Sequence, residues 1–236
     1  MAYLPKGYVS LERALSKLGV ASRTQARQWI EAGRISVDSL LIRDPLHPII
    51  PEKAKILLDH QPIAREQKRL IALHKPRGCV TTASDPQGRQ TVYDFLLDLG
   101  VHVVPVGRLD FATSGLLLLT NDTRLADRLT DPRTGVVRTY VVELRGQVDD
   151  AALQRWREGI VDGGERLQAV SVVLRKRSGR ETTVIVQLAE GKNREIRRLA
   201  TAVGSEVQKL KRIAYGGVTL GDLPAGQWRD VDLTEL

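Results

Sequence analysis

The most constraining feature of the sequence is a run of four consecutive leucines, Leu116 to Leu119. A strand that is apolar on both faces cannot have one face in water, so this run must lie inside a covered sheet. A polar turn that follows Gly107 and carries Asp110 stands immediately before it. The pattern predicts a carboxylate on a loop between two buried strands, where a rigid scaffold can present it to a cleft.

A turn aspartate also has a purely structural explanation. Asp110 can cap its own turn or pair with Arg108, and most turn aspartates form local hydrogen bonds of this kind. From the residues alone, the catalytic and the structural interpretation of Asp110 both stay open.

The chain from residue 67 onward mixes strand-like and helix-like segments without a regular alternation. Strands are predicted at 70–74, 103–106, 116–120, 137–144, 170–174 and 182–188, and helices at 92–99, 123–130, 150–159 and 193–203. Because no βαβ repeat is visible, we expect an α+β fold with a mainly antiparallel sheet over residues 67–236.

Residues 1–66 have a different pattern. Apolar residues at helical spacing stop at Gly19, and Ser22 with Gln25 three residues later predicts a capping box for a second helix that ends at Gly33. Two short strands, at 35–37 and 40–42, follow around a tight turn. The segment 62–68 is short, polar and charged, which is typical of a linker. We therefore expect a small helix-helix-strand domain before the α+β domain.

Basic side chains on these two helices predict a surface for nucleic acid. Arg23 and Arg27 lie one turn apart, and Lys17 and Arg34 stand at helix ends. If those ends converge, the four charges form one face for a phosphate backbone. An ordinary solvated helix surface explains the same charges equally well.

The overall composition supports a polyanionic partner. Lys and Arg number 36 against 28 Asp and Glu, a net charge of +8, which favours nucleic acid over a membrane surface. Aromatic residues make up only 4%, which argues against a surface that stacks many successive bases. No apolar run approaches the roughly 20 residues of a membrane span, and the first residues lack the pattern of a signal peptide. We expect a cytoplasmic protein with no membrane partner.

Metal and redox chemistry are not predicted. The single Cys79 can form neither an internal disulfide nor a thiolate metal site. The four histidines show no ligand-like spacing. We expect no metal and no cofactor.

Two segments resemble known families. Residues 9–59, especially 10–15 and 22–35, resemble the ribosomal protein S-four-like RNA-binding domain. Gly107-Arg108-Leu109-Asp110, followed by residues 113–122, is similar to the signature of ribosomal RNA pseudouridine synthases. In that family the aspartate of the motif is catalytic, so the resemblance implies this role for Asp110.

Further motifs of the same family follow in the expected order. Residues 75–78 with Thr81 resemble its opening lysine-proline motif, and residues 138–140 resemble the motif whose tyrosine lines the uridine pocket, here Tyr140. Arg138 stands where lysine is common in the family.

The closing motif of the family resembles residues 190–198 and 210–212. Its arginine after the isoleucine pairs with the catalytic acid, which implies this role for Arg197. Thr123, where many relatives have glycine, is a turn variation outside the catalytic set.

The resemblance implies that the chain isomerises uridine to pseudouridine in ribosomal RNA, the large-subunit (23S) RNA being favoured over the small-subunit (16S) RNA. The implied catalytic residues are Asp110, Tyr140 and Arg197, and whether Asp110 attacks covalently or abstracts a proton stays open. The implied substrate-binding residues are Lys75, Arg77, Arg108, Thr113, Asn193, Arg194, Arg198, Leu210 and Arg212.

The expected partner is ribosomal RNA or a pre-ribosomal particle, bound by a monomer. A rival interpretation is a non-catalytic RNA-binding or ribosome-assembly protein of the same fold. The joint presence of Asp110, Tyr140 and Arg197 argues against it, because binding alone does not need the acid. A basic DNA-binding regulator with a helix-turn-helix is a third interpretation, weakened by the lack of an obvious dimer-forming segment.

Overall fold

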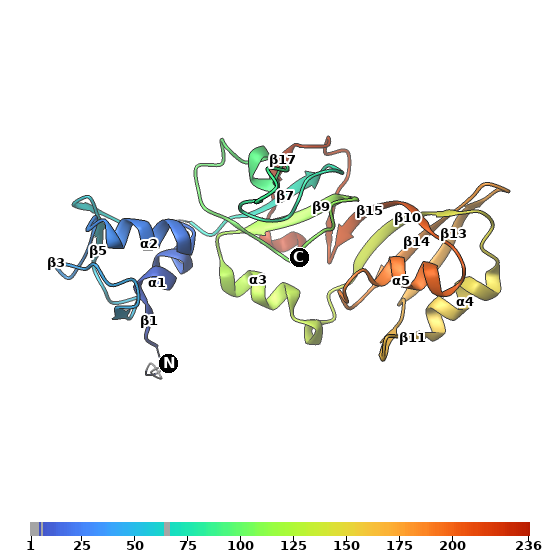
Figure 1. Ribbon diagram of the computed structural model, residues 1–236, viewed down its shortest axis with the longest axis horizontal. Helices are drawn as coiled ribbons and strands as arrows, with labels where there is room; N and C mark the ends of the chain where they lie inside the picture. Colours follow the sequence, from blue (N-terminus) through green and yellow to red (C-terminus); the bar gives the residue numbers. More distant parts are fainter. Residues whose placement is uncertain (1–4, 6, 64–66) are drawn as a thin grey trace. The chain divides into compact units, whose positions relative to one another are not determined.

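The computed structural model describes residue 5, residues 7–63 and residues 67–236, and divides the chain into two units (Figure 1). Unit 1 comprises Met1–Arg69, Asp98–Val104 and Thr120–Thr123. Unit 2 comprises Leu70–Leu97, Pro105–Leu119 and Arg124–Leu236. The expected domain boundary after residue 66 falls on residues 64–66, which lie outside the described residues, and it stays a prediction.

Unit 1 contains the two predicted helices, α1 (Leu11–Lys17) and α2 (Arg23–Glu31). The Ser22 hydroxyl accepts the backbone N–H of Gln25 at 3.1 Å, so the predicted cap of α2 is confirmed. Buried side chains of both helices form one core with those of the short strands. These strands are β1 (Val9–Ser10) paired with β4 (Pro48–Ile49), and a sheet in the order β3 (Leu40–Leu41), β2 (Ile35–Val37), β5 (Ile56–Leu58) and β6 (Gln61–Pro62).

A nine-stranded sheet forms the centre of unit 2, in the order β13-β14-β10-β15-β9-β7-β17, with β8 beside β9 and β16 beside β15. The pairs β13–β14, β14–β10, β10–β15 and β7–β17 are antiparallel, whereas β15–β9 is parallel. The predicted α+β class with a mainly antiparallel sheet is confirmed. The strands are β7 (Leu70–Lys75), β8 (Val104–Pro105), β9 (Thr113–Thr120), β10 (Arg138–Arg145), β13 (Ser171–Arg177), β14 (Glu181–Leu188), β15 (Val207–Tyr215), β16 (Val218–Thr219) and β17 (Trp228–Asp230).

Three α-helices accompany this sheet: α3 (Thr123–Thr130), α4 (Asp150–Glu158) and α5 (Glu195–Ala202). Figure 1 shows α4 and α5 on one side of the strands β10, β14 and β13. Between α4 and β13 the chain forms a separate two-stranded hairpin, β11 (Ile160–Asp162) and β12 (Glu165–Leu167). Short 3-10 turns complete the unit: η1 (Val92–Phe95), η2 (Pro132–Thr134) and η3 (Leu233–Glu235).

One sequence prediction for this part of the chain is wrong, and one central strand was missed. The helix expected at 92–99 is only the turn η1, because Thr91 and Asp94 close a capping box around it and the chain joins unit 1 from residue 98. The strand β15 was not predicted, although it lies at the centre of the sheet. Its pairing with β10 shifts register at two places, so its apolar residues do not alternate regularly.

The parallel pairing of β9 with β15 depends on Gly115. This residue stands opposite Arg212 in the register, at φ +105°. A Cβ atom on Gly115 would lie 2.1 Å from the carbonyl oxygen of Arg212, far inside van der Waals contact. Only glycine therefore lets the two backbones approach, and this approach sets the turn before β9 beside β15.

We expect Gly115→Ala to lower the free energy of unfolding by at least about 3 kcal/mol, because the methyl group collides with backbone that cannot give way. The matched control is Gly135→Ala, at φ +62° with no atom within 4 Å of the added Cβ. It should cost only about 1 kcal/mol, the price of the left-handed backbone alone. Chemical denaturation followed by circular dichroism measures both, and equal losses for the two variants would contradict the close-approach argument.

Candidate active site

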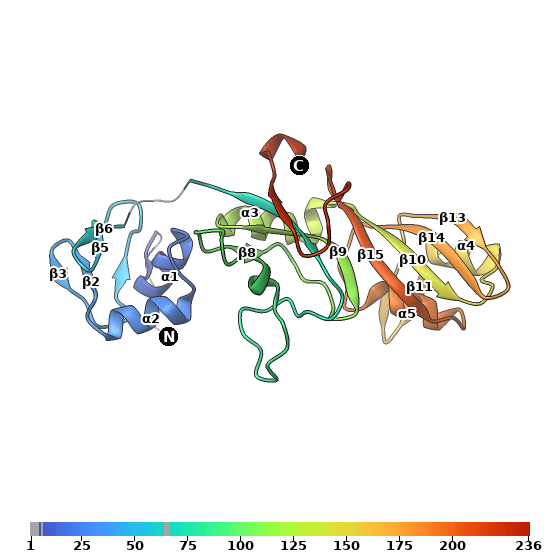
Figure 2. The same ribbon diagram turned by 90° about the horizontal axis from the view of Figure 1, so that it is seen from above.

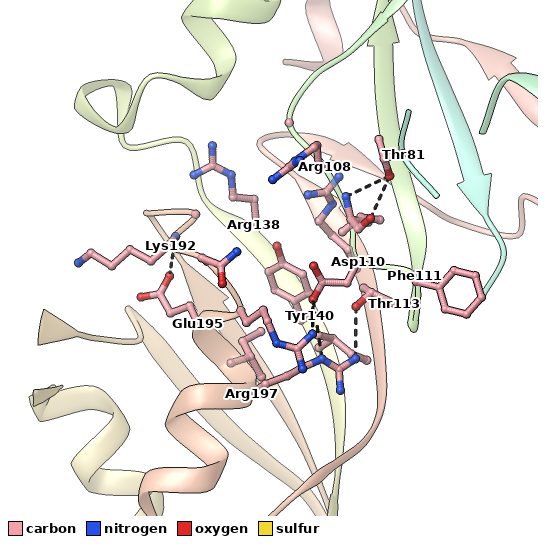
Figure 3. Close-up of a pocket in the computed structure, with 18 of the residues that line it drawn as sticks. Thr81, Arg108, Asp110, Phe111, Thr113, Arg138, Tyr140, Lys192, Glu195 and Arg197 are labelled. Atoms are coloured by element: carbon pink, nitrogen blue, oxygen red, sulfur yellow. Dashed lines mark hydrogen bonds and ion pairs between the residues drawn. The ribbon is translucent and has the colours of Figure 1, made fainter. Parts of the chain in front are cut away.

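A cleft of about 590 Å³ opens in unit 2 around Asp110 (Figure 3). Its walls come from the loop after β7, the turn before β9, strands β10 and β15, and the segment that leads into α5. The strands bring these parts together, because β15 pairs with β10 on one side and β9 on the other.

Asp110 is held by its backbone and leaves its carboxylate free to face the cleft. Its carbonyl oxygen accepts the N–H of Thr113 at 3.0 Å and the ammonium of Lys75 at 3.1 Å. The side chain is 41% exposed, and its Oδ2 atom lies 3.8 Å from Nε of Arg197 and 3.7 Å from Nη1 of Arg194. No ion pair between Asp110 and Arg108 is found among the described residues. The geometry thus favours a carboxylate directed at guanidinium groups over a local turn contact.

Arg197 reaches Asp110 from the interior. Its side chain is only 16% exposed. Nη1 donates to the carbonyl of Val207 at 3.4 Å and Nη2 to the hydroxyl of Thr113 at 3.5 Å, whereas the buried Nε has no hydrogen-bond partner. Burial lowers the pKa of Arg197, the charge of Arg194 lowers it further, and the carboxylate of Asp110 opposes both. A guanidinium stays protonated despite such a shift, so Arg197 is a largely enclosed cation.

Arg194 reaches the same carboxylate from the surface. It precedes the first residue of α5 with φ 50° and ψ 32°, a left-handed conformation that is uncommon for a residue other than glycine. Its side chain is 56% exposed. Asp110 therefore has one rigid and one solvent-accessible cationic neighbour.

The back wall of the cleft is a buried group of aromatic and basic side chains. Tyr140 is 9% exposed and stands opposite Arg212 in the β10–β15 pairing. The guanidinium carbons of Arg138 and Arg212 lie 4.9 and 5.0 Å from the ring centre of Tyr215, which donates its hydroxyl hydrogen to the carbonyl of Leu129. Nε of Arg212 donates to the carbonyl of Leu116 at 2.7 Å, while its buried Nη2 has no partner.

Lys75 corrects one sequence prediction. It was expected to bind substrate, yet it is 0% exposed and does not line the cleft. Its ammonium donates to the carbonyls of Pro76 at 3.1 Å, Asp110 at 3.1 Å and Thr113 at 2.8 Å, and burial lowers its pKa. Thr81 adds a hydrogen bond to the carbonyl of Leu109 at 2.9 Å. Lys75 therefore supports the turn that carries Asp110, and all of its donors are used.

Arg198 corrects a second prediction. Instead of facing the cleft, its guanidinium contacts Asp162 at 2.5 Å and Glu165 at 2.6 Å, both on the hairpin β11–β12. The reason is helical geometry: Arg197 and Arg198 are neighbours on α5 and so point in directions about 100° apart. The two neighbouring arginines of α5 therefore face different partners, Arg197 the cleft and Arg198 the hairpin.

The other predicted substrate-binding residues lie at or near the cleft. Arg77 is exposed and outside the lining, but its charge is close enough to lower the pKa of Arg197. The residues that line the cleft are Arg108, Thr113, Asn193, Arg194, Leu210 and Arg212. Their contacts with a substrate stay predictions.

Sequence reasoning missed two features of the lining. Glu195 is buried, and its carboxylate accepts the N–H of Lys192 at 3.3 Å. Burial raises the pKa of Glu195. Phe111 is 46% exposed beside Asp110, with the guanidinium carbon of Arg89 at 5.8 Å from its ring centre. A single acid within a basic run, and an aromatic residue next to a candidate catalytic acid, are the signals that could have found them.

The four basic residues predicted to bind RNA in unit 1 differ in exposure and in whether an acidic side chain already pairs with them. Arg27 pairs with Glu12 at 2.8 Å, and Arg34 pairs with Asp59 and lies 5.7 Å from the ring centre of Trp29. Arg23 is exposed, and Lys17 is half-buried in the last turn of α1.

Among the described residues, no group of three or more His, Cys, Asp or Glu side chains is placed to hold a metal ion. No helix in the described ranges is long and apolar enough to cross a membrane.

Comparisons with known proteins agree with the sequence resemblances. The family model for RNA pseudouridylate synthase matches residues 69–202, and the model for the S4 domain matches residues 10–48. An uncharacterized RNA pseudouridine synthase of Aquifex aeolicus is 36% identical over 97% of this chain and 92% of its own length. Ribosomal large subunit pseudouridine synthase B of Escherichia coli (strain K12) is 40% identical over 95% of this chain and 80% of its own.

The corresponding protein of Bacillus subtilis (strain 168), with the same name, is 34% identical over 94% of this chain and 91% of its own length. A crystal structure of a pseudouridylate synthase matches with a TM-score of 0.66 at 26% identity, covering 96% of this chain and 97% of that one. The relatives named as pseudouridine synthases thus match almost the whole length of this chain, including the S4-domain segment.

We expect Lys75→Met to lower the free energy of unfolding by about 3 kcal/mol, because three backbone carbonyls each lose a hydrogen bond from the ammonium, and the one at Thr113 is buried. The control Lys176→Met removes an exposed lysine that pairs with Glu181, and should stay within about 0.5 kcal/mol of wild type. Chemical denaturation measures both variants. A Lys75→Met protein as stable as the control variant would show that the ammonium does not support the turn.

Proposed function

The chain belongs to the RNA pseudouridine synthase family, and we propose that it converts a uridine of large-subunit ribosomal RNA into pseudouridine with Asp110 as the catalytic residue. The observation that carries this proposal is the Asp110 carboxylate in a cleft, facing the largely enclosed Arg197 at 3.8 Å. The relatives from Escherichia coli and Bacillus subtilis that are named for the large subunit favour that RNA over the small-subunit RNA.

The reaction needs a positioned carboxylate and little else. The bond from the sugar to the uracil nitrogen breaks, the base turns, and a bond forms from the sugar to a ring carbon. The hydrogen on that carbon leaves as a proton and the nitrogen gains one, so atoms and electrons balance without an added oxidant or reductant. In this scheme Asp110 acts on the sugar or the base, as nucleophile or as proton acceptor.

Arg197 and Arg194 have different roles in this proposal. Arg197 donates to Val207 and Thr113, so it keeps the carboxylate oriented throughout the reaction. Arg194 is exposed and can turn from Asp110 to a phosphate of the incoming RNA, for which a guanidinium is well suited. Once Arg194 has turned away, the nucleotide can approach the Asp110 carboxylate with fewer side chains in its path.

Tyr140 forms the wall against which the uracil ring stacks. It is buried except for its face toward the cleft, beside Asp110 in Figure 3. A base that enters the cleft must leave its own stack, at a cost of a few kcal/mol unless it is already unpaired. Contact with an aromatic ring, together with RNA binding by unit 1, offsets that cost.

The proposed partner is ribosomal RNA, free or in a pre-ribosomal particle, bound by one copy of the chain. The cleft supports this, because its lining comes from residues of a single unit. The S4 domain match over residues 10–48 supports RNA contact by unit 1.

The decisive test is pseudouridine mapping on large-subunit and small-subunit ribosomal RNA transcripts, and on pre-ribosomal particles, incubated with wild-type protein or Asp110→Asn. We expect one discrete site with wild type and none with the variant, at unchanged RNA affinity. The matched control is Asp127→Asn, an exposed aspartate on α3, which should retain wild-type activity. Full activity of Asp110→Asn would remove Asp110 from the mechanism. RNA binding without any pseudouridine from wild type would favour the non-catalytic binding protein.

Arg23→Ala should weaken RNA binding at low salt and reduce the slope of log affinity against log salt by about 1, because one phosphate contact is lost. The turnover rate at saturating RNA should not change, since Arg23 lies in unit 1. Arg175→Ala, which removes an exposed arginine on β13, is the control. Filter binding over a salt series measures the slopes, and indistinguishable slopes for the two variants would place the RNA surface elsewhere.

A further inference from the structure

The hairpin β11–β12 lies outside the nine-stranded sheet and beside α5, as the two views in Figures 1 and 2 show. None of its side chains lines the cleft. It nevertheless makes several contacts with residues 192–198, the part of the chain that carries both arginines of Asp110.

The start of α5 has no side-chain cap among the described residues. Arg194 precedes the helix in a left-handed conformation, and its side chain makes no capping hydrogen bond. A helix end without a cap loses about 1 kcal/mol and tends to fray in its first turn. The first turn of α5 contains Arg197, so fraying there would move the guanidinium that faces Asp110.

Arg198 supplies the missing support. Its Nε contacts the carboxylate of Asp162 at 2.5 Å, its Nη2 donates to the carbonyl of the same residue at 2.6 Å, and its Nη1 contacts Glu165 at 2.6 Å. All three nitrogens are thus used on one hairpin, and the side chain is only 22% exposed. A guanidinium that contacts two carboxylates at once is held more rigidly than one in a single surface ion pair.

A second contact joins the hairpin to the segment before α5. The ammonium of Lys192 donates to the carbonyl of Arg166 on β12 at 2.6 Å, and the buried Glu195 accepts the N–H of Lys192. The hairpin is therefore attached on both sides of Arg194.

We propose that Arg198, through Asp162 and Glu165, is a positioning residue that fixes the first turn of α5 and so holds Arg197 against Asp110. This inference rests on the proposed function of Asp110 and Arg197. The distances from Asp110 to Arg197 and Arg194, 3.8 and 3.7 Å, are ion-pair distances without a hydrogen bond, so no short contact at the carboxylate would hold the turn in place.

The effect of losing Arg198 should be local. Ile196 in the first turn and Leu199 and Ala200 in the second are buried and anchor α5 in the core. The helix therefore stays folded, and the loss of Arg198 changes only the fine position of its first turn. A displacement of about 1 Å at a catalytic group can cost about a hundredfold in rate, so a large kinetic effect does not require unfolding.

The experiment uses the full chain and ribosomal RNA transcripts that wild type modifies. The uridines of these transcripts carry tritium on the ring carbon that becomes bonded to the sugar, and release of this tritium reports turnover. We expect Arg198→Ala to lower kcat at least about tenfold with KM within about twofold. Arg198→Lys keeps one charge for one carboxylate and should recover part of kcat. The matched control is Asp150→Asn, which breaks the 2.6 Å pair with Arg177 elsewhere in unit 2 and should leave kcat unchanged.

A double-mutant cycle tests the route through the hairpin. Asp162→Asn with Glu165→Gln should lower kcat as Arg198→Ala does, and combining all three changes should add little, since each removes the same link. The hairpin variant keeps Arg198 and remains informative if Arg198→Ala folds poorly by circular dichroism.

Three results would overturn the inference: wild-type kcat in Arg198→Ala, additive losses in the cycle, or a rise in KM at unchanged kcat. The last would restore Arg198 as a direct RNA contact. Each presupposes active wild-type protein, so failure of the inference is separate from failure of the proposed function, which shows as no tritium release from wild type.

Discussion

The parallel contact between β9 and β15 is the constraint on which the rest of unit 2 depends. It joins the strand that follows the Asp110 turn to the strand that leads away from α5, and it needs a residue without a side chain at Gly115. Through β15 the contact also reaches β10 and Tyr140. Residues far apart in the sequence therefore meet at one cleft because two backbones can approach there. The interactions among the side chains of the site depend on this backbone contact.

The positive charges around Asp110 outnumber its single negative charge, and they differ in exposure to solvent. Asp110 faces two guanidinium groups, one buried and one exposed, and Arg77 adds a third positive charge nearby. One carboxylate cannot satisfy this excess, so the site as a whole attracts an anion, as a cleft for RNA should. Because Arg197 is fixed by hydrogen bonds and Arg194 is not, an arriving phosphate can recruit the second without disturbing the first.

Much of the fold and part of the site could be predicted from the sequence, because they depend on local patterns. The apolar run from Leu116 located β9, Ser22 located the start of α2, and the order of the motifs brought Asp110 and Arg197 together. What failed depends on tertiary context. Nothing local says that Lys75 is enclosed by carbonyls, or that Arg198 turns toward carboxylates more than thirty residues earlier in the chain. The strand β15 was missed because its bulges break the alternation that identifies strands.

The way Lys75 holds the turn that carries Asp110 has an evolutionary consequence. Its ammonium supports the turn through backbone carbonyls, and every residue type offers that same oxygen. Phe111 and the alanine after it can therefore be replaced by other side chains without removing the support of the aspartate beside them. Variation at these two positions can then change which RNA the cleft accepts while the support of Asp110 stays the same. One scaffold can in this way give rise to enzymes that modify different uridines.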